Sequence, residues 1–136
     1  MFLPEEFGYL PNGLSLVAFT AAYQDCDEWL SSLLIYLHKN LEFLISFFKN
    51  NIPQIEVIGP EGTYLVWLDF RKLGIDNDKL ENFLFDKAKV ALDDGFKFGG
   101  GGEGFQRINI ACPLITLKSA LERIYQAVEK LKSFTS

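Results

Sequence analysis

The stretch Gly104-Phe-Gln-Arg-Ile-Asn-Ile-Ala-Cys-Pro113 places one arginine, Arg107, in an otherwise apolar segment between a glycine and a proline. Such a bounded apolar run is typical of a largely buried β-strand. A guanidinium group is seldom buried without a partner, and its flat fork of N–H donors fits a carboxylate. The pattern alone favours an ion pair with a structural Asp or Glu, or a side chain that reaches solvent at the strand edge. The functional alternative is that Arg107 binds the carboxylate of a ligand.

The segment before this strand, Phe98-Gly-Gly-Gly-Gly-Glu-Gly104, has the glycine content of a phosphate-binding loop. Such a loop needs a helix N-terminus after it, because the helix amides bind the anion. A strand follows here instead. The loop from Gly99 to Gly104 is therefore better interpreted as a flap beside a ligand site or as a long turn.

Elsewhere in the sequence, β-branched and aromatic residues predict three more strands, one of them weak. A turn over residues 60–62 separates the first two, and Asp93-Asp94-Gly95 is predicted to be a turn. The predicted strands cover residues 55–58, 63–70 and, weakly, 90–92.

Four helices are predicted. The apolar run 14–23 indicates a buried helix, and Asp25 with Glu28 forms a capping box for a long helix to about Asn50. Asp78 with Glu81 is a second capping box, for a helix to about residue 89, and Thr116 is the predicted cap of the last helix. The long helix carries one apolar stripe, widened by neighbouring aromatic residues, so we expect it to be buried on more than one side. The stripe consists of Leu30, Leu34, Leu37, Leu41, Leu44 and Phe48.

This order predicts an α+β fold, in which helices pack on a small, mostly antiparallel sheet and a long helix comes first. The chain of 136 residues is expected to divide into an irregular lead-in over 1–12, a helical segment over 13–50 and a small α+β domain over 51–136. Phenylalanine is abundant, with 13 residues, so part of the aromatic surface is expected to meet another domain or subunit.

Composition and charge argue against several classes of protein. A net charge of −5 without a cluster of basic residues argues against nucleic acid and anionic membranes as partners. No apolar run reaches membrane-spanning length, and the first residues lack the basic region of a secretory signal. Cys26 and Cys112 match no metal-ligand spacing and indicate two reduced thiols in a cytoplasmic protein. One histidine, His38, with no nearby nucleophile gives no catalytic triad, so no complete catalytic set is present.

Three stretches together resemble a known family: Glu61-Gly-Thr-Tyr-Leu-Val-Trp-Leu-Asp-Phe-Arg71, Lys87-Ala-Lys-Val-Ala-Leu-Asp-Asp-Gly95, and 98–113. They are similar to the C-terminal part of pyridoxal-phosphate (PLP) enzymes of the class I/II aminotransferase superfamily, especially the MalY/PatB-type cystathionine beta-lyases. Two short motifs of the long helix, 27–30 and 40–43, are similar to the same subgroup. The resemblance implies the small domain of a fold-type I PLP enzyme, with the helix that joins it to the large domain.

The resemblance assigns to Arg107 the role of binding the α-carboxylate of an amino-acid substrate, so it now favours the functional interpretation. It also implies that Gly62, Thr63, Tyr64, Gly101 and Gly102 lie near the mouth of the site. The family's cofactor lysine belongs to the large domain and matches no lysine here. We therefore expect part of a longer PLP-dependent lyase or aminotransferase, inactive by itself and forming a homo-oligomer such as a dimer. The alternative is a non-catalytic remnant that serves in self-association or binding.

Overall fold

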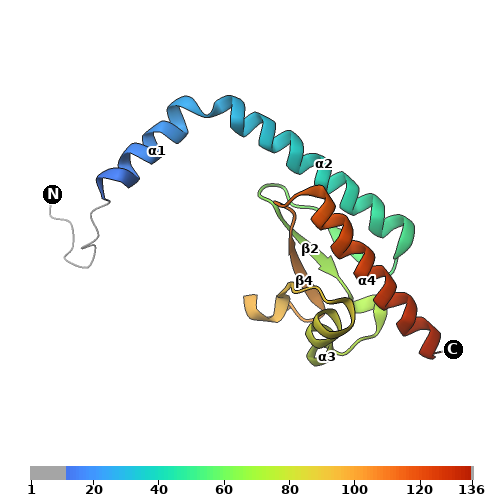
Figure 1. Ribbon diagram of the computed structural model, residues 1–136. Coiled ribbons are helices and arrows are strands. Elements are labelled where there is room, and N and C mark those ends of the chain that lie inside the picture. The colour runs from blue at the N-terminus through green and yellow to red at the C-terminus, as the bar shows by residue number, and fades with distance from the viewer. Residues whose placement is uncertain (1–11, 136) are drawn as a thin grey trace, which may run out of the picture. The chain divides into compact units, whose positions relative to one another are not determined.

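The computed structural model describes residues 12–135, and its contacts divide the chain into two units, 1–35 and 36–136 (Figure 1). Apart from Asn12, the predicted lead-in over 1–12 lies outside the described residues. The predicted boundary at residue 50, between the helical segment and the small α+β domain, is not tested by this division and stays a prediction. Among the described residues no helix is long and apolar enough to cross a membrane.

The first unit contains helix α1 (Gly13–Asp25), whose N-terminus is capped by the side chain of Asn12. The Asn12 Oδ1 atom accepts a hydrogen bond of 2.8 Å from the Ser15 backbone N–H. The predicted helix is confirmed, but its predicted burial is wrong for this chain, because every residue of α1 is exposed. Apolar side chains lie all round the helix, so nothing within the chain selects one face for burial.

Helix α2 (Asp27–Asn51) confirms the long helix and its end. The predicted cap is wrong, because Asp25 is the last residue of α1. The stripe is buried at Leu37, Leu44 and Phe48 but not at its start, where Leu30 and Leu34 are 48% and 56% exposed. The prediction of burial on more than one side is therefore also wrong for the chain by itself.

The sheet belongs to the second unit and consists of β1 (Glu56–Ile58), β2 (Leu65–Asp69), β3 (Asp93–Asp94) and β4 (Phe105–Asn109). Its strand order is β1-β2-β4-β3, and every neighbouring pair is antiparallel. This confirms the predicted α+β fold. The weak strand predicted over residues 90–92 is wrong, since pairing with β4 begins at Asp93.

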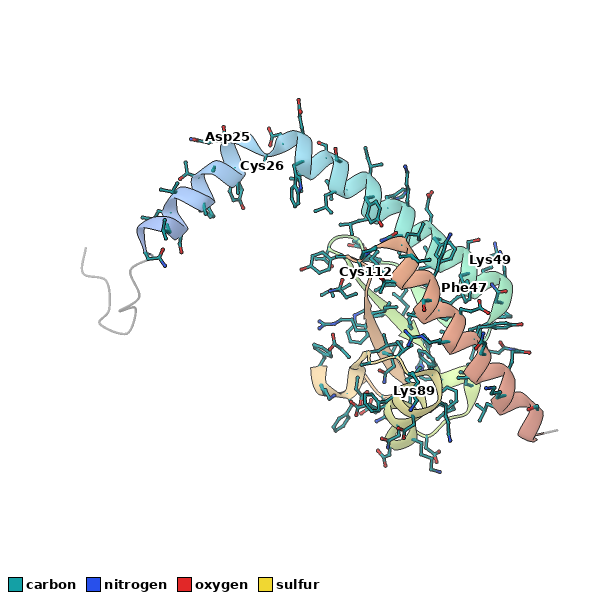
Figure 2. All side chains as sticks on the ribbon, in the orientation of Figure 1. Asp25, Cys26, Phe47, Lys49, Lys89 and Cys112 are labelled. Carbon is teal, nitrogen blue, oxygen red and sulfur yellow. The ribbon has the colours of Figure 1, made fainter. Side chains whose placement is uncertain are left out.

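Short helical segments connect the strands. They are η2 (Arg71–Leu73), α3 (Asn77–Asn82), the π-helix η3 (Phe83–Ala88) and η4 (Gly95–Phe98), and the long helix α4 (Leu114–Thr135) follows the last strand. Both predicted caps are wrong: Asp76, not Asp78, precedes α3, and α4 begins at Leu114, so Thr116 lies inside it. The residue that follows η3 as its C-cap is Lys89, labelled in Figure 2, with a left-handed backbone of φ 56°.

One face of the sheet carries the core. Helix α4 and the second half of α2 lie side by side on it (Figure 1). Helix α4 packs on the sheet through one apolar face, with four of its leucine, isoleucine and valine residues almost fully buried. The enclosed residues from the sheet and these two helices include Leu44, Phe48, Val66, Leu68, Ile108, Leu117, Leu121, Ile124 and Val128. The opposite face of the sheet is therefore the one left for a functional site.

Candidate carboxylate-binding site

A row of four residues crosses the sheet on the face opposite the core. Ile58 pairs with Trp67, Trp67 with Arg107, and Arg107 with Asp93. Residues that pair directly across antiparallel strands point to the same face. Arg107 is therefore on a central strand, with an aromatic side chain on one side and a carboxylate on the other.

The guanidinium of Arg107 has two contacts. Its Nε and Nη2 atoms donate to Oδ2 of Asp93 at 3.2 and 2.8 Å. Its carbon Cζ lies 4.3 Å from the centre of the Phe98 ring, a cation–π contact. The ion pair that the pattern alone favours is thus present. It occupies only the Nε side of the guanidinium, and among residues 12–135 no hydrogen-bond acceptor contacts Nη1.

The Arg107 side chain is 25% exposed and lines a surface hollow of about 470 Å³. The hollow is not confined to the face opposite the core, because it is lined by Asp93, Asn109 and Cys112 and also by the core residues Ile108 and Leu117. Burial raises the pKa of the Cys112 thiol. Figure 2 labels both cysteines, and both are free thiols, one in each unit. Arg107 is therefore the cationic group that this hollow offers to an anion.

Arg71, the first residue of η2 after β2, provides a comparison. Its Nε and Nη2 atoms bind the two oxygens of Asp69 at 3.0 and 2.7 Å, and its Cζ lies 4.6 Å from the centre of the Phe105 ring. The hydrogen bonds from Arg71 hold the pKa of the buried Asp69 carboxyl below its usual value. Arg71 is 62% exposed, so water screens its charge more than that of Arg107. Of the two, Arg107 is the better anion-binding group.

The glycine-rich loop is a series of turns packed against η4. The backbones of Gly95 and Gly102 are so close that a Cβ atom on either residue would overlap the other. Gly101 and Gly102 line a hollow of about 300 Å³ together with Ile58, Trp67 and Phe98. Two of the predicted site-mouth residues therefore lie beside the row that contains Arg107.

The other three predicted site-mouth residues are in the connection from β1 to β2. Tyr64 accepts a backbone hydrogen bond of 3.0 Å from Ile110, beyond the end of β4. Thr63 has φ 69°, which is strained for a β-branched residue, and its Oγ1 accepts from Leu65 N at 3.3 Å. Gly62, Thr63 and Tyr64 are exposed and do not line the hollow that Gly101 and Gly102 line.

The lysines do not fit covalent attachment of PLP. Every lysine whose burial is described is exposed, and Lys72, Lys79 and Lys97 form ion pairs with carboxylates. A lysine that attacks an aldehyde must lose its proton, which burial assists and an ion pair opposes. No group of three or more potential metal ligands occurs among the described residues either. The described residues thus offer a site for an anion and none for the cofactor's aldehyde.

Two contributors to the site were missed from the sequence. The sequence predicts a turn at Asp93 and gives Phe98 no role beyond the start of the glycine-rich segment. Neither has a local motif, because both meet Arg107 through the register of β3 with β4 and through the position of η4. The sequence offers one weak signal for these two residues: an acidic and an aromatic residue lie shortly before the strand that contains Arg107.

Known proteins resemble the chain closely. Cystathionine beta-lyase PatB from Bacillus subtilis is 38% identical over 117 residues, which cover 86% of this chain and 30% of PatB. A PLP-bound structure from Clostridium difficile 630 is 49% identical with a TM-score of 0.83, over 86% of this chain and 30% of that one. Cystalysin from Treponema denticola, which contains PLP, is 37% identical with a TM-score of 0.88, over 93% and 32% of the two chains.

The chain spans about a third of the length of these proteins. No family model matches it. The similarity covers both units and most of the described residues, and the fold agrees with that of the PLP-containing structures. The chain is thus similar to the C-terminal, small-domain part of PLP-dependent enzymes of the class I/II aminotransferase superfamily, and resembles the MalY/PatB-type cystathionine beta-lyases.

Proposed function

We propose that the chain is the substrate-binding small domain of a PLP-dependent C–S lyase acting on sulfur amino acids, as a cystathionine beta-lyase does. In this role Arg107 holds the α-carboxylate of the substrate. The observation that carries the proposal is the arrangement of the guanidinium: Asp93 takes the Nε side, and the edge formed by Nη1 and Nη2 is left for a second carboxylate.

The chemistry assigned to this chain is binding and orientation. A carboxylate gripped by two parallel hydrogen bonds cannot rotate freely, so the bonds at the neighbouring Cα atom are held in one direction. PLP, bound by the longer protein, would supply the electron-withdrawing chemistry. The substrate's α-carboxylate is common to elimination and transamination, so Arg107 serves either reaction.

The carboxylate site can be tested in the chain itself by NMR, with propionate as the probe and neutral propionamide as the control ligand. Propionate should shift the side-chain and backbone N–H signals of Arg107 saturably, while propionamide should not. Arg107→Lys should weaken this binding roughly tenfold or more, because an ammonium group cannot replace the planar fork. The N–H signals of Arg71 provide an internal control in the same spectra. Equal, unsaturable shifts at both arginines would contradict the proposal.

A second prediction is that the chain alone does not catalyse the reaction. Mixed with PLP and cystathionine, it should release no pyruvate and show no absorbance band of a lysine-bound cofactor, because every lysine whose burial is described is exposed and lacks the burial that favours a neutral, reactive amine. A cystathionine beta-lyase of full length, assayed in parallel, serves as the positive control. Pyruvate formation by the purified chain at a rate proportional to its concentration would refute this prediction.

A non-catalytic binding or self-association module is the second candidate. The observation in its favour is α1, where five large apolar side chains are between 52% and 84% exposed: Leu14, Leu16, Val17, Phe19 and Tyr23. Light scattering distinguishes the two candidates when read with the propionate titration. A homo-oligomer without propionate binding favours the module, and saturable propionate binding favours the substrate-binding domain.

A further inference from the structure

The orientation of Arg107 is set by two residues that have no assigned role, Asp93 and Phe98. Asp93 uses one oxygen, Oδ2, to accept from both Nε and Nη2, which fixes the rotation of the guanidinium within its plane. The Cζ atom of the guanidinium lies over the Phe98 ring, 4.3 Å from its centroid, so the ring limits where the group can move. Together the two contacts define the direction of the edge formed by Nη1 and Nη2.

Phe98 is itself held in place by the surrounding backbone. Its ring meets Trp67 edge-on, with centroids 5.4 Å apart and an interplanar angle of 89°. It is the last residue of η4, whose first turn is capped by Asp94 Oδ1 accepting from Phe96 N at 3.3 Å. The close approach of Gly95 and Gly102 fixes the other side of η4. Although 53% exposed, the Phe98 ring thus has defined neighbours on both sides.

We infer that Asp93 and Phe98 are positioning residues that present the Nη1–Nη2 edge of Arg107 to a ligand carboxylate. The inference rests on the proposed function of Arg107. A free arginine side chain samples many rotamers and must lose that freedom to make two parallel hydrogen bonds. Holding the guanidinium in advance removes part of this cost. In this arrangement both residues act on the ligand through Arg107.

Whether removal of the Asp93 side chain weakens or tightens carboxylate binding distinguishes a positioning role from a purely electrostatic one. The negative charge of Asp93 offsets that of Arg107 and repels a ligand carboxylate. If charge were the only contribution of Asp93, its removal would tighten carboxylate binding. If Asp93 positions Arg107, removing its side chain weakens binding, and a neutral residue that keeps the oxygen acceptor restores it.

The test is a propionate titration of the full chain, read from the backbone amide signals of β4 in folded variants. Asp93→Ala and Phe98→Leu should each weaken propionate binding several-fold, on the order of fivefold for a lost orienting contact. Asp93→Asn should bind at least as tightly as the unmodified chain. Phe96→Leu is the matched control, because Phe96 is an equally exposed neighbour with no ring contact to Arg107, and it should change nothing.

Unchanged or tighter binding in Asp93→Ala, with normal saturation of the unmodified chain, would overturn the positioning role of Asp93 and leave the proposed function intact. Unchanged propionate binding in Phe98→Leu would overturn the positioning role of Phe98 and would also leave the proposed function intact. Absence of saturable binding in the unmodified chain would overturn both the positioning role and the proposed function. Weaker binding in Asp93→Asn than in Asp93→Ala would also contradict the inference, since the acceptor would then have no benefit.

Discussion

Replacing Phe48 with alanine should lower the free energy of unfolding by about 3–5 kcal/mol, the usual cost of removing a buried aromatic ring. Phe48 is completely buried, and it lies in the cluster that joins α2 to the sheet and to α4. Neither layer can move inward to fill the space, because the sheet and α4 also pack on each other through Ile108, Leu121 and Ile124. A cavity would therefore remain.

Urea denaturation followed by circular dichroism measures this effect. Phe85→Ala is the matched control, since Phe85 is 62% exposed on η3 and its loss should change stability by no more than about 0.5 kcal/mol. Equal losses in the two variants would mean that α2 does not pack on the sheet as described. Loss of all cooperative unfolding in Phe48→Ala would agree with the expected size of the effect, provided Phe85→Ala unfolds cooperatively.

The fold could be predicted from the sequence wherever a pattern is local. The apolar stripe of α2, the β-branched run of β2 and the apolar face of α4 each depend on a period that the residues themselves display. The burial of α1 and of the first half of α2 could not be predicted in this way. Apolar side chains at Leu14 or Leu34 indicate that burial is favourable, but whether a surface covers them depends on what is available to pack there.

Helix starts were the least predictable part of the fold. Each predicted cap was a residue of the right chemistry in the wrong place: Asp25 closes α1, and Thr116 lies within the first turn of α4. Acidic and hydroxyl residues are also common in the first turn, where they favour the helix dipole, so their presence does not fix the position of the cap. The backbone hydrogen bonds settle the start, as when Thr116 N donates to Pro113 O.

A local sequence pattern indicates one residue of the candidate site, Arg107. Arg107 stood out because a cation in an apolar strand needs a partner, and the structure supplies one in Asp93. The identity of that partner follows from β3, a strand of two residues that has no propensity signal of its own. The same limit applies to Phe98, since contacts across a sheet depend on register, and register is fixed by the whole set of strand pairs.

The second large effect is expected at Asn40, the buried amide through which α2 contacts the segment after β4. Asn40 is 1% exposed, and its Nδ2 atom donates to the carbonyls of Ile110 and Cys112, both at 2.9 Å. Asn40→Asp keeps the shape but replaces the donor by a carboxylate facing two carbonyl oxygens. At neutral pH this should cost about 3 kcal/mol or more, because the charge is buried without a partner.

The loss of stability in Asn40→Asp should increase as the pH rises. Burial raises the pKa of the introduced carboxyl above its unfolded value of about 3.9. The folded variant therefore binds the proton more tightly than the unfolded one. The destabilisation should be smallest below about pH 4 and grow as the pH rises through the raised pKa. Denaturation of the variant and of the unmodified chain at a series of pH values measures the difference.

Asn51→Asp is the matched control for Asn40→Asp, since Asn51 lies on the same helix and its Nδ2 also donates to a carbonyl, that of Phe47 at 2.8 Å, but at an exposed position. A charge there costs only about 0.3–1 kcal/mol, from its place at the helix C-terminus. A large, pH-dependent loss of unfolding free energy in Asn40→Asp alone would mean that the register between α2 and the end of β4 depends on the Asn40 amide. A loss equal in the two variants, or independent of pH, would mean that apolar packing sets that register and that the two hydrogen bonds contribute little.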